Sequence, residues 1–194
     1  MMYGLFFQNI AKHIQLELAE EAKLQSKLHF KIISKNEALL TVGNPCRSIY
    51  FVNKGCLRMY QNHKNGEETN ILFCPENWWA SDIISFSLGS PATYSIDALE
   101  NSEVIYIDLK DLEQLYIQIP KLERFFRILF QNGFALYQNR LTLALSTSAE
   151  IRYALFNKQY PMLHNRISQK HIASYLGITP VFLSIIKKRA IENK

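Results

Sequence analysis

The sequence predicts an α+β fold in which an antiparallel β sandwich or jelly roll is followed by a long helix and a small, mainly helical C-terminal unit. Three observations predict it. Short β-rich runs broken by turn residues recur about every ten residues from 37 to 108. Residues 121–145 carry a helical apolar pattern without proline, and residues 167–189 have the spacing of a helix-turn-helix. The 194 residues, 48% of them apolar, suffice for one large domain or two small ones.

The first half of the chain is expected to form helices and then the sheet. Residues 5–29 carry helical apolar spacing, which predicts one or two helices. Strands are expected at 37–42, 48–53, 56–61, 69–73, 94–99 and 103–108. Hairpin signals at Asn53-Lys54-Gly55 and Asn65-Gly66 separate some of them, and the short strands favour an antiparallel arrangement.

The long helix, preceded by a short helix at 111–118, has more apolar residues than one stripe can hold. We therefore expect it to have two partners, the β domain and the same helix of a second copy. The stripe assigned to the homodimer interface consists of Leu122, Phe126, Leu129, Gly133, Leu136 and Leu143, with Arg140 as its one polar intruder. The neighbouring face holds Phe125, Phe134, Tyr137 and Leu141. A helix buried between two domains of a monomer is the alternative.

A domain boundary is expected after the long helix. Thr147-Ser148-Ala149-Glu150 is a capping box that begins a new helix, which ends at Tyr160-Pro161. With Ser146 as the hinge, residues 1–145 form the first domain with its dimerisation helix, and residues 146–194 form the second.

The second domain carries the helix-turn-helix. Its first helix, beginning near Ser168, places Ile172, Ala173 and Leu176 on one face. Gly177 ends this helix, and Thr179-Pro180 provides an N-cap and a proline at the first position of the next. Leu183 and Ile186 would face inward. An ordinary buried helical hairpin is the alternative interpretation.

The charge of this region favours a polyanionic partner. Residues 152–194 hold eight basic residues against one acidic residue, a net charge of +7, whereas the whole chain carries +5. A basic face beside a helix-turn-helix is typical of phosphate binding. The residues expected to contact DNA are Ser168, Lys170, Thr179, Val181, Ser184, Ile185, Lys187, Lys188 and Arg189.

This order of parts, with the hairpin sequence Ile49–Arg58 and the segment Gln169–Pro180, resembles the Crp/Fnr family of bacterial transcription regulators. The resemblance implies a cyclic-nucleotide-binding-type jelly roll, a dimerisation helix and a winged helix-turn-helix. It also implies a regulator rather than an enzyme, binding double-stranded DNA as a homodimer on an inverted repeat. RNA polymerase and a small-molecule effector are further expected partners.

The expected effector pocket departs from the nucleotide-binding members. Ser81-Asp82 stands where they have Gly-Glu, and Ala92-Thr93 falls near their Arg-Ser pair. No lysine or arginine lies between Gly66 and Lys110, so a bound cyclic phosphate would lack its counter-charge. We therefore predict weak or no binding of cyclic AMP. Trp78 and Trp79 either pack in the core and loops or line a more apolar cavity for another effector.

The second helix of the helix-turn-helix, the recognition helix, also differs from that of the family members. Members that read bases directly have Arg, Glu and Arg where this chain has Pro180, Val181 and Ile185, which cannot form bidentate hydrogen bonds to bases. Val181 and Ile185 could instead touch thymine methyl groups, which predicts an A·T-tolerant site supplemented by DNA deformability. The chain stops soon after this helix, and we expect it to lack the hairpin wing of many members. A sensor or protein-interaction module that no longer reads DNA is the alternative function.

No metal or cofactor is expected. Cys46, Cys56 and Cys74 are too few for an iron–sulfur cluster with four thiolate ligands and are expected to be reduced packing residues. A metal-dependent cupin-like enzyme is a third alternative, but the strand region holds only His63 and no ligand cluster. Haem sensing stays open, because five histidines are present. No run approaches the ~20 apolar residues of a membrane span, so a cytoplasmic location without membrane contact is expected.

Overall fold

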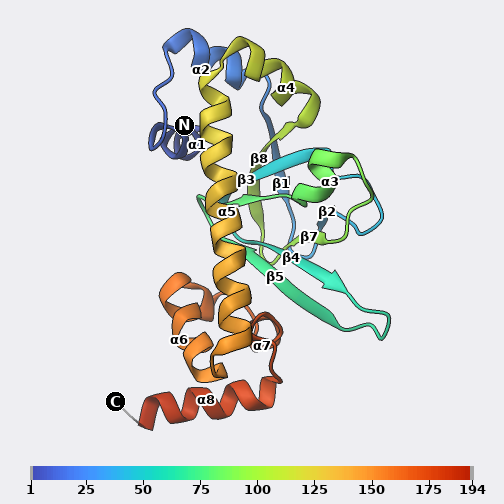
Figure 1. The fold of residues 1–194 in the computed structure, drawn as a ribbon, viewed down its shortest axis with the longest axis vertical. Helices are drawn as coiled ribbons and strands as arrows, with labels where there is room; N and C mark the ends of the chain where they lie inside the picture. The colour runs from blue at the N-terminus through green and yellow to red at the C-terminus, as the bar shows by residue number, and fades with distance from the viewer. Residues whose placement is uncertain (1, 193–194) are drawn as a thin grey trace.

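The computed structural model describes residues 2–192 and confirms a β domain, a long helix and a helical C-terminal unit, in that order (Figure 1). The chain begins with α1 (Gly4–Ala11) and α2 (Leu18–Gln25), as the helical spacing predicts. Phe6 and Ile10 on one face of α1 are almost fully buried, which holds this helix against the β domain. None of the helices in the described part of the chain is long and apolar enough to cross a membrane.

The β domain consists of two four-stranded antiparallel sheets, with strand orders β1-β8-β3-β6 and β2-β7-β4-β5. The six predicted strands are confirmed with small shifts in their ends. The strands are β1 (His29–Ile33), β2 (Ala38–Leu40), β3 (Ser48–Lys54), β4 (Leu57–Asn62), β5 (Glu68–Cys74), β6 (Trp79–Ala80), β7 (Ser95–Ala98) and β8 (Ser102–Asp108). Strands β1 and β6 and the short helix α3 (Ile83–Leu88) were not predicted.

The β3–β4 hairpin turns at Gly55, whose φ of +92° is favourable only for glycine. A Cβ at this position would lie 2.8 Å from the Cα of Ser102 and closer still to its side chain. The turn therefore brings two backbones into contact, which explains why the Asn-Lys-Gly sequence ends one strand and begins the next.

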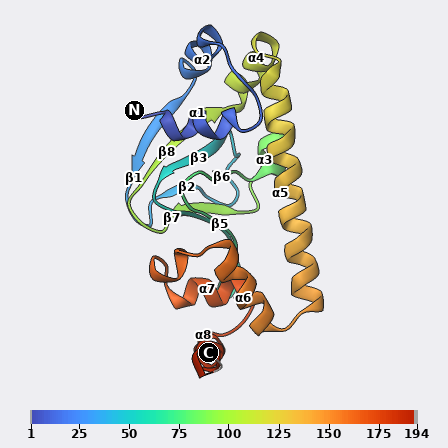
Figure 2. The same cartoon turned by 90° about the vertical axis from the view of Figure 1, so that its left-hand side faces the viewer.

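The long helix α5 (Lys121–Ser146) follows α4 (Leu109–Gln118) and runs beside the β domain to the C-terminal unit (Figures 1 and 2). The homodimer stripe predicted for it is wrong at Leu122 and Phe126, which are 0% and 3% exposed in the core of their own chain. Leu129 and Leu136 also pack against this core. Leu122 and Phe126 are therefore covered by their own chain, whereas Leu129, Gly133, Leu136 and Leu143 are half-buried.

On the neighbouring face of α5, Phe125 is buried at 1% exposure, but the apolar residues that follow it are exposed. Phe134 is 65% exposed, Tyr137 38%, Leu141 62% and Leu145 80%. These residues recur every three or four positions and so lie along one face. The helix therefore has two apolar faces, as the sequence indicates, and the more exposed residues lie on the face that was not assigned to the homodimer.

The C-terminal unit contains α6 (Ala149–Gln159), a 3-10 helix (Leu163–Asn165), α7 (Gln169–Leu176) and α8 (Pro180–Glu192). The predicted cap of α6 is shifted by one residue, because the Ser148 side chain accepts from the N–H of Ile151 whereas Thr147 ends α5. The turn between α7 and α8 is as predicted. Gly177 has a φ of +68°, and Thr179 Oγ1 accepts from the N–H of Phe182.

A second apolar cluster joins the C-terminal unit to the β domain. It brings Cys56, Phe73 and Leu99 together with residues of α6, α7 and α8. The Tyr175 ring stacks on Phe73 at a centroid distance of 5.2 Å. All three cysteines are free and buried, in agreement with their predicted packing role.

Candidate nucleic-acid interface

Helix α8 lies at the end of the molecule furthest from α2 (Figures 1 and 2). Its exposed side carries both apolar and basic residues. Leu183 and Ile186 are buried at 0% and 2% exposure, as predicted, and fix the orientation of the helix. Val181 and Ile185 are 72% and 42% exposed on the other side. Phe182, at 37%, adds an exposed ring that the sequence interpretation missed.

The polar members of the predicted interface lie near helix ends and along the outer side of α8. Ser168 Oγ accepts from the N–H of His171, which leaves its hydroxyl proton free to be donated. Ser184 Oγ donates to the carbonyl of Pro180. Lys170, Lys188 and Arg189 are exposed and Lys187 is half-buried. Arg189 lies 3.9 Å from a carboxylate oxygen of Glu150, a long and exposed ion pair.

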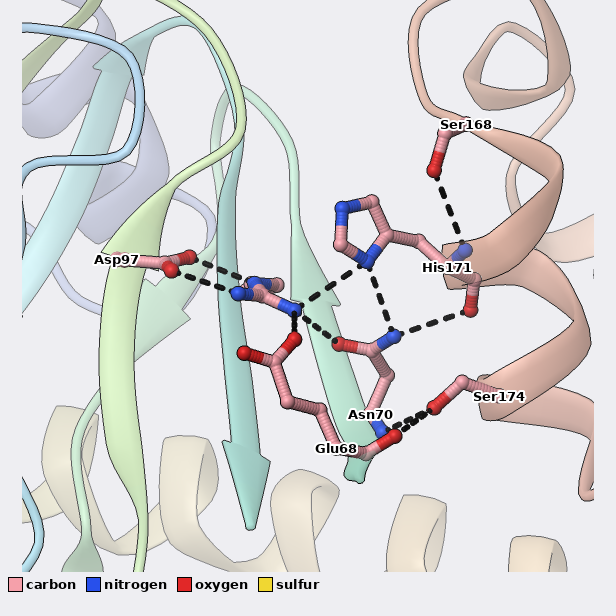
Figure 3. A network of polar contacts seen from close by, with 7 residues as sticks. Glu68, Asn70, Asp97, Ser168, His171 and Ser174 are labelled. Atoms are coloured by element: carbon pink, nitrogen blue, oxygen red, sulfur yellow. Dashed lines mark hydrogen bonds and ion pairs between the residues drawn. The ribbon is translucent and has the colours of Figure 1, made fainter. Parts of the chain in front are cut away.

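Helix α7, the first helix of the motif, is docked on strand β5 by hydrogen bonds (Figure 3). Ser174 Oγ donates to the carbonyl of Glu68 at 2.6 Å and accepts from the N–H of Asn70 at 2.9 Å. The Asn70 side chain donates to the carbonyl of His171 at 3.1 Å. Side-chain hydrogen bonds therefore hold α7 of the C-terminal unit against β5, the edge strand of the second sheet.

Arg58 of β4 is the centre of the polar network beside this contact. Its Nε and Nη2 bind both carboxylate oxygens of Asp97 at 2.8 Å, and Nη1 binds Glu68 at 2.6 Å. The same Nη1 lies 3.2 Å from Nδ1 of His171. Because a guanidinium only donates, His171 Nδ1 must accept, and the imidazole is therefore neutral with its proton on Nε2.

Two further arginines connect the units. Arg140 Nη2 donates to the carbonyls of Asn70 and Tyr175, both at 2.8 Å, so the polar intruder of the α5 stripe joins α5, β5 and α7. Arg166 pairs with Glu76 and Glu100 of the β domain. The position of α8 is thus set by contacts between α7 and the β domain.

The predicted effector pocket coincides in part with a cavity of about 910 Å³ between α1, α5 and the β domain. Ser81 and Asp82 line it, whereas Ala92 is buried elsewhere and Thr93 is exposed outside it. Asp82 is the N-cap of α3, and its oxygens accept from the N–H groups of Ser85, Thr93 and Tyr94. Asp82 and Thr93 are therefore hydrogen-bonded as expected, but the donor is the backbone N–H of Thr93 and not its side chain.

The two tryptophans both line the cavity and pack against neighbouring aromatic rings. Trp78 and Trp79 line the cavity, and Trp79 also packs against Phe6 and Phe51 with ring centroids 5.2–5.5 Å apart. The Trp79 Nε1 donates to Asn9 at 3.0 Å, which fixes the ring at the cavity wall.

Comparisons with known proteins agree with this arrangement. The cyclic nucleotide-binding domain family model matches residues 30–118. The fumarate and nitrate reduction regulatory protein of Vibrio cholerae is 28% identical over 165 residues, which are 77% of this chain and 63% of that protein. A crp/fnr-family structure from Eubacterium rectale has a TM-score of 0.71 at 15% identity and covers 98% of this chain and 88% of its own. Residues 30–118 thus match a cyclic nucleotide-binding domain, and the chain is similar in sequence and fold to Crp/Fnr regulators.

Another solved structure shares the fold at low sequence identity. FixK2 from Bradyrhizobium japonicum has a TM-score of 0.75 at 16% identity, covering 86% of this chain and 85% of its own. The chain spans about 63% of the length of the Vibrio cholerae relative.

The contact between His171 and Arg58 predicts how pH affects the docking of α7 on the β domain. Burial, together with the neighbouring Arg58 cation, lowers the pKa of His171 from its ordinary 6.5, so the docked state favours the neutral ring. Its contribution to stability is complete above pH 6.5 and decreases as the pH falls through that value. We expect amide hydrogen exchange in α7, corrected for intrinsic rates, to be faster at pH 5.5 than at pH 7.5.

A matched pair of variants separates this effect from general acid destabilisation. His171→Gln keeps a polar side chain without a proton to gain, and it should reduce the pH dependence. His63→Gln, at an exposed position on the β domain, should leave it unchanged. Equal pH dependence in the wild-type protein and His171→Gln would remove His171 from this role.

Proposed function

We propose that this chain is a DNA-binding transcription regulator that acts as a homodimer in the cytoplasm, with no enzymatic activity of its own. The observation that carries the proposal is helix α8, which is held by α7 and presents exposed Val181 and Ile185 beside Lys188 and Arg189. The net charge of +7 over residues 152–194 supports a phosphate-rich partner. Residues 1–145 would be the effector domain and residues 146–194 the DNA-binding domain.

The two recognition helices of a dimer would enter successive major grooves about 34 Å apart, which requires an inverted repeat. Val181 and Ile185 would contact thymine methyl groups, and Ser184 could form single hydrogen bonds. Base readout of this kind tolerates A·T pairs, so DNA deformability would supply part of the specificity. RNA polymerase and a small-molecule effector are further proposed partners.

The cationic residues of α8 give the first test of DNA binding. We expect the pair Lys187→Ala and Lys188→Ala to weaken binding almost equally on all sequences and to make the slope of log K against log salt shallower by about one to two. The reason is that each lysine releases counterions from a phosphate. Fluorescence anisotropy with labelled duplexes at several salt concentrations measures both quantities.

Lys23→Ala with Lys110→Ala is the matched control, since both lysines are exposed on α2 and α4 at the opposite end of the molecule (Figure 1). The control should keep the wild-type slope. An unchanged slope in the α8 variant would exclude these lysines from phosphate contact.

The effector domain gives a second test. We expect no micromolar binding of cyclic AMP or cyclic GMP by calorimetry, because the segment from Gly66 to Lys110 offers no cation for the phosphate and Asp82 already accepts three backbone N–H groups. Micromolar binding by the unaltered protein would contradict this account of the pocket.

The alternative of an interaction module that does not read DNA makes a different prediction. Recovery of genomic DNA with the tagged protein should enrich one palindromic motif if the chain is a regulator. Recovery without any enriched motif would support the interaction module.

A further inference from the structure

Several polar groups that line the cavity between α1, α5 and the β domain already have hydrogen-bond partners within the chain. Asn9 Nδ2 donates to Oδ1 of Asn77 at 2.8 Å, and Asn9 Oδ1 accepts from Trp79. Ser81 Oγ donates to the carbonyl of Ser48 at 3.2 Å. The Asp82 carboxylate accepts three backbone N–H groups. A molecule in the cavity would therefore gain few hydrogen bonds from these groups.

Most of the rest of the wall is apolar or aromatic, with Asn132, Tyr94 and Tyr137 adding polar groups. Phe125, Leu129 and Phe130 of α5 and Trp79 and Met59 of the β domain all line the cavity. Its volume of about 910 Å³ lies within the ~300–1,000 Å³ range of small-molecule sites. This wall suits a flexible or elongated hydrocarbon better than a polar nucleotide.

The one lysine or arginine of the cavity wall, among the described residues, lies at the α1 end. This residue is Lys12, which is exposed. His13, also exposed, lies beside it, with its ring 6.1 Å from that of Phe125. The one carboxylate among the described residues of the wall, Asp82, is 1% exposed, and its oxygens accept from backbone N–H groups. Lys12 therefore offers a counter-charge for an anion at the α1 end.

We infer that the cavity binds a single straight-chain fatty acid, with its alkyl chain between α5 and the β domain and its carboxylate at Lys12. This inference rests on the proposed function, because it names a ligand class for the effector domain, and it is tested by ligand binding in the absence of DNA. A carboxylate at the end of a hydrocarbon meets both conditions, because the chain needs no hydrogen bonds and the head group pairs with the cation.

The chain length should control the affinity. Each buried methylene contributes about 0.8 kcal/mol, which is roughly a fourfold increase in affinity. Decanoate, dodecanoate and tetradecanoate, all below their critical micelle concentrations, should therefore bind the full chain with dissociation constants that fall by about fifteenfold at each step of two methylenes. Isothermal calorimetry without DNA measures these constants.

The head group should act through Lys12. Dodecanol should bind at least tenfold more weakly than dodecanoate to the wild-type protein. Lys12→Gln should abolish this preference and Lys12→Arg should keep it. Lys23→Gln, an exposed lysine of α2 outside the cavity, is the control and should behave as wild type.

Filling the cavity should prevent binding of both ligands. Gly133 lines the cavity, and a Cβ placed there has no neighbouring atom within 4 Å. Gly133→Leu should therefore fold, as judged by circular dichroism and thermal unfolding, and bind neither dodecanoate nor dodecanol. The inference is overturned if wild type binds no fatty acid, if dodecanol and dodecanoate bind equally, or if folded Gly133→Leu still binds dodecanoate.

Discussion

Replacing Arg58 by methionine is expected to destabilise the folded chain by about 3–5 kcal/mol, because it leaves a buried carboxylate without its counter-charge. The side chains of Arg58 and Asp97 are each 8% exposed, and the guanidinium binds both oxygens of Asp97. The same substitution removes the hydrogen bond to His171 of α7. Urea denaturation measures the loss of free energy.

A second variant shows whether the buried charge is the cause. Arg58→Met with Asp97→Asn should cost clearly less than the two single variants added together, because the pair shares one interaction. Lys31→Ala, which breaks the exposed pair with Glu37, should leave the urea midpoint unchanged. If Arg58→Met lowers the free energy of unfolding by less than about 1 kcal/mol, water must solvate the charge of Asp97 and the account of a buried ion pair is wrong.

Replacing Phe134 and Leu141 together by glutamate is expected to give a monomer that binds DNA about 10²–10⁴-fold more weakly. These side chains are 65% and 62% exposed on one face of α5, so the charges should not disturb the fold of a single chain. They would repel in a symmetric pair of helices, and each recognition helix would then bind a half-site without the avidity of its partner. Sedimentation velocity and anisotropy on the same sample measure both effects.

The matched control places the same charges on exposed apolar residues elsewhere. Leu18 in α2 and Ile117 in α4 are 86% and 83% exposed. Leu18→Glu with Ile117→Glu should leave the dimer and its DNA affinity unchanged. A Phe134→Glu and Leu141→Glu variant that remains dimeric would show that another surface pairs the subunits.

Local sequence patterns predicted most helices and strands. The elements of the β domain that were missed, β1, β6 and α3, are short or lack a clear pattern. Strand β1 was not predicted because only Ile33 of its five residues is buried, so no alternation of buried and exposed residues marks it. Strand β6 has two residues, too few for any pattern. Helix α3 is held by Asp82 as its N-cap and by Gly89 after its end, but six residues give little periodicity.

The partners of the two α5 faces could not be assigned from spacing. Periodicity shows that both stripes are apolar, but not which one packs in the same chain. Phe126 belongs to the regular stripe that resembles a coiled-coil seam, yet it is buried with Trp79 and Tyr116. Arg140 was the available signal, since a cation within the regular stripe indicated contact with polar groups of the same chain rather than a dry helix pair.

The recognition helix was predicted closely, whereas the docking of α7 was not. Gly177, Thr179 and the inward pair Leu183 and Ile186 act within one short segment, where local rules apply. The hydrogen bonds from Asn70 to His171 and Ser174 join residues more than a hundred positions apart, and nothing in their separate neighbourhoods indicates a shared contact.

The central claim is that two copies of the cationic C-terminal unit bind one DNA duplex. Multi-angle light scattering of the purified protein with a duplex selected from random sequence, at low and at physiological ionic strength, tests it most directly. The account predicts two chains on each inverted-repeat duplex and an affinity that falls steeply with salt. A single chain that leaves every duplex unbound even at low ionic strength would contradict it.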